Sequence, residues 1–181
     1  MLFLEFWEGI NKTYFPTVQP YTDYPFFSYA KALELMDEPS LWKQSSDRSA
    51  HVYRFTCLPT FQNPIAIRVD AHKRGGGLLT TTILAGQGGF EMGEIEQQTQ
   101  VRLEPNELAK VIADFEKNHF WDLLTLDPDA PLGLDGSEWL LEATWKGKYH
   151  AASRWSPDEG PVHDLGLMLL KMSSVDSGEI D

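Results

Sequence analysis

The sequence predicts an α+β domain in which helices pack on one face of an antiparallel β-sheet of about six strands. Three observations carry this prediction. Alternating apolar and polar residues recur between residues 51 and 103 and again in 138–157, which is typical of half-buried strands. Glycine-containing turns separate these runs, and strands joined by turns pair antiparallel. Apolar stripes with helical spacing follow each group of strands, which gives the order four strands, helix, two strands, helix.

The N-terminal region, residues 1–38, is expected to form an aromatic arm followed by a short helix. Pro16, Pro20 and Pro25 disfavour regular structure before the helix. Ser28 is a suitable N-cap for a helix over Tyr29–Met36, and Asp37-Glu38-Pro39 should end it. Residues 39–173 then form a single α+β domain, and residues 174–181 a flexible polar tail.

The first four strands are predicted over 51–58, 64–73, 78–85 and 94–103. In the second strand, alternation places four apolar residues on one face, and Arg68, Asp70 and His72 on the other. The first strand likewise separates Tyr53, Phe55 and Cys57 from Arg54 and Thr56. The fourth strand is polar throughout and is expected at an edge.

Two further helices are predicted from their start signals and apolar stripes. Pro105 suits a first turn, and the stripe that follows consists of Leu108, Val111, Ile112 and Phe115. The last helix should begin near Pro161, with Gly160 as its cap and Leu165, Leu169 and Met172 facing inward.

The hairpin over 138–157 has two possible registers. A two-residue turn pairs Trp145 with Lys148, whereas a three-residue turn, 146–148, pairs Trp145 with Tyr149. The three-residue turn separates apolar from polar side chains better, so it is the register we predict. It places the three tryptophans of the hairpin on the covered face, and Glu142, His150 and Arg154 together on the other.

This register leads to a hypothesis about a binding site. If Arg68 and Asp70 lie in the same sheet, they join Glu142, His150 and Arg154 on an open polar face. The alternative, to which we give more weight, is an ordinary solvated face whose loose ion pairs each contribute about 0–1 kcal/mol.

No motif in the sequence predicts catalytic residues, a metal site or a cofactor. The glycines of GGGL and GQGGFEMG lack the Gly-Lys-Ser/Thr of a phosphate loop and suit hairpin turns. The five histidines form no HExxH pair, and the single cysteine, Cys57, is expected to be a buried structural thiol.

The composition limits the classes of partner. The net charge of −12 disfavours nucleic acid and anionic membranes, and fits a basic protein partner. No run is long and apolar enough to span a membrane. A lone cysteine suits a reducing compartment, so we expect a cytoplasmic protein, or a periplasmic one if an N-terminal leader was removed.

Several segments resemble an uncharacterised family of bacterial proteins over residues 38–173, about three-quarters of the chain. The resemblance implies a bacterial α+β domain and assigns no catalytic residues. Its segments are EPSLW (38–42), VYRFTCLPTFQNPIAIRV (52–69), FWDL (120–123), LDGSEWLLEATWKGKYHAASRWSP (134–157) and LGLMLLKMS (165–173).

Three functions are consistent with these features. The leading hypothesis is a non-enzymatic, acidic protein-binding module, such as an inhibitor or a toxin-immunity protein. The second is a small hydrolase or ligand-binding protein that uses the open sheet face, with His150 as proton carrier. The third is a structural subunit of a homo-oligomer, whose aromatic arm packs on a neighbouring chain.

Overall fold

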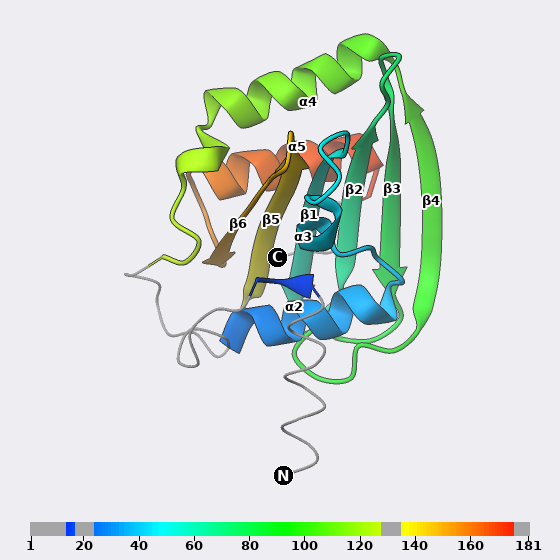
Figure 1. Cartoon of the computed structure of the whole chain (residues 1–181). Coiled ribbons are helices and arrows are strands. Elements are labelled where there is room, and N and C mark those ends of the chain that lie inside the picture. The colour runs from blue at the N-terminus through cyan, green and yellow to red at the C-terminus, as the bar shows by residue number, and fades with distance from the viewer. Residues whose placement is uncertain (1–13, 17–23, 128–134, 176–181) are drawn as a thin grey trace.

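A computed structural model describes residues 14–16, 24–127 and 135–175 (Figure 1). Most of the predicted N-terminal arm, most of the loop before the last hairpin and the end of the predicted tail lie outside these residues. The described chain forms a six-stranded antiparallel sheet in the order β4-β3-β2-β1-β5-β6, so the predicted α+β class is confirmed. Its strands are β1 His51–Pro59, β2 Ile65–Ala71, β3 Gly77–Leu84, β4 Ile95–Leu103, β5 Ser137–Trp145 and β6 Lys148–Trp155.

Helices cover both faces of this sheet, which corrects the prediction that they gather on one. In Figure 1, α2 and α3 lie in front of the sheet and α5 lies behind it. Side-chain packing places α4 on the same face as α5. The helices are α2 Tyr24–Leu35, α3 Leu41–Gln44, α4 Pro105–Lys117 and α5 Pro161–Ser173, with a 3-10 turn, η1, at Phe120–Asp122.

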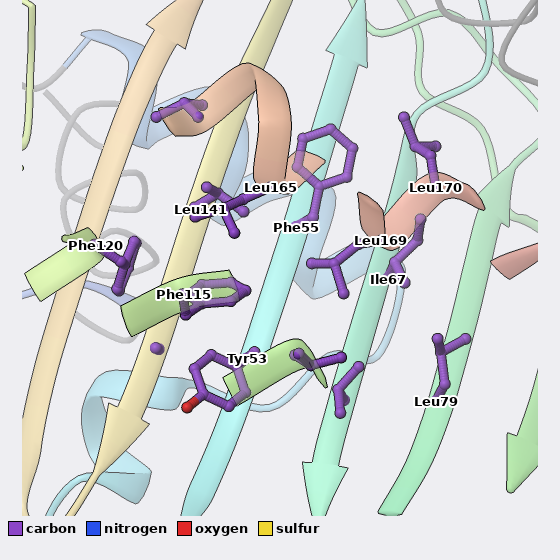
Figure 2. Packing of buried hydrophobic residues seen from close by; sticks show 14 of the residues in the cluster. Tyr53, Phe55, Ile67, Leu79, Phe115, Phe120, Leu141, Leu165, Leu169 and Leu170 are labelled. Carbon is purple, nitrogen blue, oxygen red and sulfur yellow. The ribbon is translucent and has the colours of Figure 1, made fainter. Parts of the chain in front are cut away.

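The larger core lies between the sheet and helices α4 and α5 (Figure 2). The aromatic rings of Phe55 and Trp139 meet edge to face, with centroids 5.0 Å apart. Gly166 of α5 lies directly over them, because a Cβ there would be only 2.7 Å from Trp139 Cζ3 and 2.8 Å from Phe55 Cε2. The inward faces predicted for β1 and β2 are confirmed, and so is the burial of Leu108, Val111, Phe115, Leu165 and Leu169.

The second core lies between α2 and the other face of the sheet. Tyr29, Leu33 and Met36 are fully buried there against apolar residues of the strands, including Ala66 and Leu140. Because these strand positions are themselves apolar, this face also has to be covered. The α2 helix begins at Tyr24, earlier than the predicted Tyr29, and Pro25 occupies its first turn, where a missing N–H is tolerated.

The hairpin has the two-residue turn, so the predicted three-residue register is wrong. Trp145 pairs with Lys148. Lys146 and Gly147 both have positive φ, 55° and 83°, as in the type I′ turns that match the twist of paired strands. The prediction failed because it assumed one polar face, whereas both faces of this sheet are covered.

The last two predicted helices begin where expected. Pro105 starts α4, with Glu104 and Glu107 forming a capping box, and Pro161 starts α5 after Gly160. Strand β4 lies at the edge of the sheet, as its polar sequence predicted.

Candidate functional site

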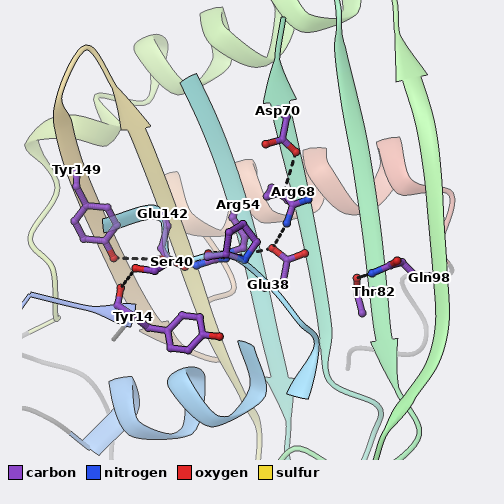
Figure 3. Close-up of polar contacts among 11 residues, drawn as sticks. Tyr14, Glu38, Ser40, Arg54, Arg68, Asp70, Thr82, Gln98, Glu142 and Tyr149 are labelled. Atoms are coloured by element: carbon purple, nitrogen blue, oxygen red, sulfur yellow. Dashed lines mark hydrogen bonds and ion pairs between the residues drawn. The ribbon is translucent and has the colours of Figure 1, made fainter. Parts of the chain in front are cut away.

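A buried network of charged side chains lies between the sheet and the segment that joins α2 to α3 (Figure 3). Arg54, from the middle of β1, is fully buried. Its Nε and Nη2 atoms donate to Oε2 of Glu142 on the adjacent strand β5, at 2.9 and 2.6 Å. Its Nη1 donates to Oε2 of Glu38 at 3.2 Å and to the carbonyl of Pro39 at 2.7 Å. We call Glu38, Arg54, Arg68, Asp70 and Glu142 the charge network.

Arg68 extends the charge network onto β2. Its Nη1 donates to Glu38 Oε2 at 2.7 Å, and its Nε to Asp70 Oδ2 at 2.8 Å. Glu38 therefore bridges two arginines that lie on neighbouring strands. The side chain of Glu38 is almost completely buried, and Arg68 and Asp70 are more accessible toward the edge of the network.

Tyr149 completes the environment of Glu142. Its hydroxyl donates to Glu142 Oε1 at 2.8 Å, so both carboxylate oxygens accept hydrogen bonds. Burial and the neighbouring Glu142 carboxylate raise the pKa of the Tyr149 phenol, which keeps it protonated as a donor. Burial alone would lower the pKa of Arg54, but the carboxylates of Glu142 and Glu38 outweigh it and the pKa is raised.

The end of α2 positions Glu38 over the sheet. The helix finishes at Leu35, and the Glu38 N–H donates to the Leu33 carbonyl. Asp37 has a φ of 53°, the left-handed conformation that commonly ends a helix. This turn directs Glu38 and the Pro39 carbonyl onto Arg54. The charge network thus ties the α2–α3 segment to strands β1, β2 and β5.

The structure divides the predicted binding residues between the two faces of the sheet. Glu142, Arg68 and Asp70 belong to the charge network. His150 and Arg154 lie on the opposite face, because His150 pairs with Ala143 and Arg154 with Trp139. The expectation that all five share one face is therefore wrong, and the cause is the hairpin register.

His150 and Arg154 have structural neighbours of their own. The His150 ring packs on Phe120, with centroids 5.1 Å apart, and burial lowers its pKa. Arg154 Nη1 donates to the backbone carbonyls of Leu124 and Ser153. Of the hairpin tryptophans, Trp139 and Trp145 share this face, but Trp155 lies on the other, opposite Glu138.

Arg54 and Glu38 are the charged residues that the sequence prediction of the site missed. The alternation of the first strand places Arg54 with Thr56 on the face opposite the core residues, but Arg54 is fully buried. A signal was present, however, because Arg54 and Glu142 each interrupt a nearly continuous apolar run, VYRFTCL and WLLEATW. Such runs are typical of strands buried on both faces, where a charge requires a partner.

The charge network has a structural role. Arg54 and Glu142 are fully buried, and each makes strong charge-assisted hydrogen bonds. Breaking such a pair is costly because it leaves a buried charge without a partner. The network holds α2 on the sheet, and its inner groups are not placed to meet a solute.

A second feature is exposed: an aromatic pair on two loops at one end of the sheet. Phe61 lies in the β1–β2 loop and Phe90 in the β3–β4 loop, with ring centroids 5.9 Å apart. Their side chains are 51% and 62% exposed. We call these two residues, with Glu91 beside them, the aromatic loop surface.

The two loops that carry this surface are bonded to each other. Gly88 N–H donates to the Gln62 carbonyl, Gly89 N–H to the Thr60 carbonyl, and Gln87 Nε2 to the Phe61 carbonyl. A Cβ at Gly88 would lie 2.5 Å from the Pro59 carbonyl oxygen. The glycines of GQGGF therefore allow the loop backbones to approach closely, a role beyond that of a turn.

The two loops that carry the aromatic loop surface, and the start of β4, hold acidic residues and no basic ones. The segments 59–67 and 84–101 contain Glu91, Glu94 and Glu96 and no lysine or arginine. All three glutamates are exposed. The aromatic pair is exposed, and the charged residues of these two segments are all negative. Such a surface favours a cationic ligand.

Glu138 of β5 is a separate, partly buried residue whose carboxyl should make stability depend on pH. Its Oε2 accepts no hydrogen bond from any described residue, and burial raises its pKa to about 7. Since the unfolded value is near 4.5, the native state binds more protons between these values, so stability should fall as pH rises through this window. The shift corresponds to as much as about 3 kcal/mol.

Glu138→Gln should remove this loss. Urea unfolding at a series of pH values should show the variant gaining on the wild type from about pH 4.5 to 7, with no further gain above. Glu159→Gln, at an exposed loop position, is the matched control. If the free energies of unfolding of Glu138→Gln and wild type change in parallel with pH, the pKa of Glu138 is not raised.

The comparisons with known proteins give no family. No family model matches the chain, and no curated protein matches it. The resemblance to a bacterial family stays a prediction. Within the described ranges, no helix is long and apolar enough to cross a membrane. The same part of the chain holds no group of three or more His, Cys, Asp or Glu side chains that could bind a metal ion.

Proposed function

We propose that this chain is a non-enzymatic protein-binding module that recognises a basic segment of a partner protein. The observation that carries the proposal is the aromatic loop surface, in which Phe61 and Phe90 are exposed on two loops fixed to each other. Fixed loops lose little conformational entropy on binding, which favours affinity. An inhibitor or toxin-immunity protein is one concrete form of this function.

The chemistry of the surface suits arginine and lysine side chains. A guanidinium group stacks on the face of a phenylalanine ring, and nearby carboxylates add attraction at longer range. Glu91 adjoins Phe90 in the sequence, and Glu94 and Glu96 follow. The net charge of −12 would also accelerate encounter with a basic protein.

The division of the charged residues favours binding over acid–base catalysis. The hydrolase hypothesis required His150 near Glu142, but the two lie on opposite faces of the sheet. The third hypothesis relied on the aromatic arm packing on another chain. The described arm residues Tyr14 and Phe15 are instead buried against their own chain.

A peptide-binding experiment tests the proposal. Short fluorescent peptides rich in arginine and lysine are titrated with the full chain, alongside peptides of equal length rich in glutamate. We expect anisotropy to report binding of basic peptides only. Phe61→Ser/Phe90→Ser should weaken it by about tenfold or more, since exposed aromatic anchors often dominate binding energy.

Leu124→Ser is the control, because Leu124 is 63% exposed and lies elsewhere on the surface. It should leave the affinity unchanged. The proposal is wrong if no basic peptide binds better than the acidic set. It is equally wrong if the double phenylalanine variant binds as well as Leu124→Ser.

A further inference from the structure

The outer edge of β4 lacks a neighbouring strand among the described residues. The sheet order ends at β4, and Figure 1 shows no labelled element beyond it. Eight of its nine residues are partly or fully exposed on their side chains, and only Leu103 is buried. Ile95 and Val101 are 41% and 45% exposed. Such an edge presents N–H and C=O groups that can pair with another strand.

The opposite edge of the sheet is protected. On β6, the Ser153 N–H donates to the Thr125 carbonyl at 2.8 Å, and Arg154 bonds the Leu124 carbonyl. The segment after η1 therefore covers part of that edge. On β4, neither proline nor lysine interrupts residues 95–103, although these are common devices for blocking an edge.

The sequence of β4 is complementary to itself in the antiparallel direction. If a two-fold axis passes through Thr99, Gln98 lies opposite Gln100 of the second copy, and Gln97 opposite Val101. The same axis places Glu96 of each copy opposite Arg102 of the other copy, which gives two such pairs. Both residues are exposed, and opposite charges across a strand pair are favourable.

Neighbouring registers are less favourable. An axis through Gln100 would place Arg102 opposite Gln98 and leave no pair of opposite charges within the strand, whereas the like pair Glu94–Glu104 at the Thr99 axis lies outside it. An axis through Gln98 would oppose Glu96 to Gln100 and move the partner of Arg102 to Glu94, before the strand begins. The ladder between β3 and β4 is regular from Gln97 to Leu103 and shifts by one residue at Glu96, so the straight segment available for pairing ends next to Glu96.

We propose that β4 pairs antiparallel with β4 of a second copy of this chain, about a two-fold axis at Thr99. The pairing joins two six-stranded sheets into one continuous sheet. It leaves the Phe61–Phe90 pair of each copy outside the paired edge, so the dimer presents two aromatic loop surfaces. The proposal does not depend on the function proposed above, because the pairing needs neither Phe61 nor Phe90; Glu96 is the residue that the two proposals share.

Charge reversal within β4 tests the pairing. Sedimentation equilibrium of the full chain, over a wide concentration range at low salt, should show reversible dimers. Glu96→Arg and Arg102→Glu each place like charges opposite each other twice, and each should weaken dimerisation by about tenfold or more. Mixing the two variants in equal amounts should restore dimers, because every pair then joins opposite charges. The double variant Glu96→Arg/Arg102→Glu should also dimerise.

Glu159→Arg and Lys43→Glu should not affect dimerisation, because both residues are exposed, Glu159 follows β6, and Lys43 lies in α3, which contacts β5 and β6. Circular dichroism and thermal melting check that each variant folds. A wild-type chain that stays monomeric at the highest concentration would overturn the proposal. So would a dimer that tolerates both single reversals, or one that the mixture fails to restore. The two proposals are separated by Phe61→Ser/Phe90→Ser, which leaves β4 unchanged and should dimerise like the wild type even where it no longer binds basic peptides.

Discussion

Replacing Arg54 with alanine should lower the free energy of unfolding by about 3–5 kcal/mol. The substitution leaves the buried carboxylates of Glu142 and Glu38 without their shared guanidinium group. Tyr149 and Arg68 remain as partners but cannot replace the two bonds that Arg54 makes to Glu142. Urea unfolding followed by tryptophan fluorescence measures the loss.

Arg74→Ala is the control, since Arg74 is exposed in the turn between β2 and β3 and should change stability by less than about 0.5 kcal/mol. The double variant Arg54→Leu/Glu142→Leu should lose much less free energy of unfolding than the two single variants lose in sum, because it removes both members of the pair. Additive losses would mean that the two charges are not coupled, contrary to the structure.

Phe55→Ala should lower the free energy of unfolding by about 3–5 kcal/mol, because it opens a cavity in the main core. Phe55 is fully buried, packs edge to face on Trp139 and lies against Gly166 of α5, where an added Cβ would be 2.8 Å from its ring. The cavity would lie next to Gly166, which has no side chain that could move into it. Thermal and urea unfolding of the variant give the measurement.

The control for Phe55 is Phe61→Ala, which truncates the same residue type at a position that is 51% exposed. It should change the free energy of unfolding by less than about 0.5 kcal/mol. A similar loss for both variants would contradict the separation between a core phenylalanine and a surface one. A stable Phe61 variant also makes the binding experiment interpretable.

The main elements of the fold were predictable because their signals are local. Pro105 and the stripe from Leu108 to Phe115 define α4 within a few residues. The alternation of β2 fixes its inward face, and the polar sequence of β4 indicates an edge. The start of α2 was less predictable, because Ser28 resembles an N-cap but lies inside a helix that begins at Tyr24.

The hairpin register and the second core were not predictable from local signals. Sorting side chains by polarity assumes that one face meets water, and α2 violates that assumption by covering the second face. Leu140 and Ala151 are buried under α2 on the same face as Glu142. The turn conformation of Lys146-Gly147 selects the register, and it depends on strand twist as well as polarity.

The candidate site was predicted in part. Glu142, Arg68 and Asp70 do lie in one network, but Arg54 and Glu38 join them, and Arg54 is far from Glu142 in the sequence. A sequence pattern does not reveal that an arginine in β1 meets a glutamate after a helix. His150 and Arg154 were assigned to this group only through the wrong register. Phe61 and Phe90 were not predicted as a pair because the contact between their loops is long-range.

The most direct test of where this chain meets a partner is a nuclear magnetic resonance titration of the isotope-labelled protein with an arginine-rich peptide. We expect chemical-shift changes at Phe61, Phe90 and Glu91 and in the adjoining loops, with the backbone signals of Arg54 and Glu142 unmoved. Changes centred instead on His150 and Arg154, or on the charge network, would contradict it.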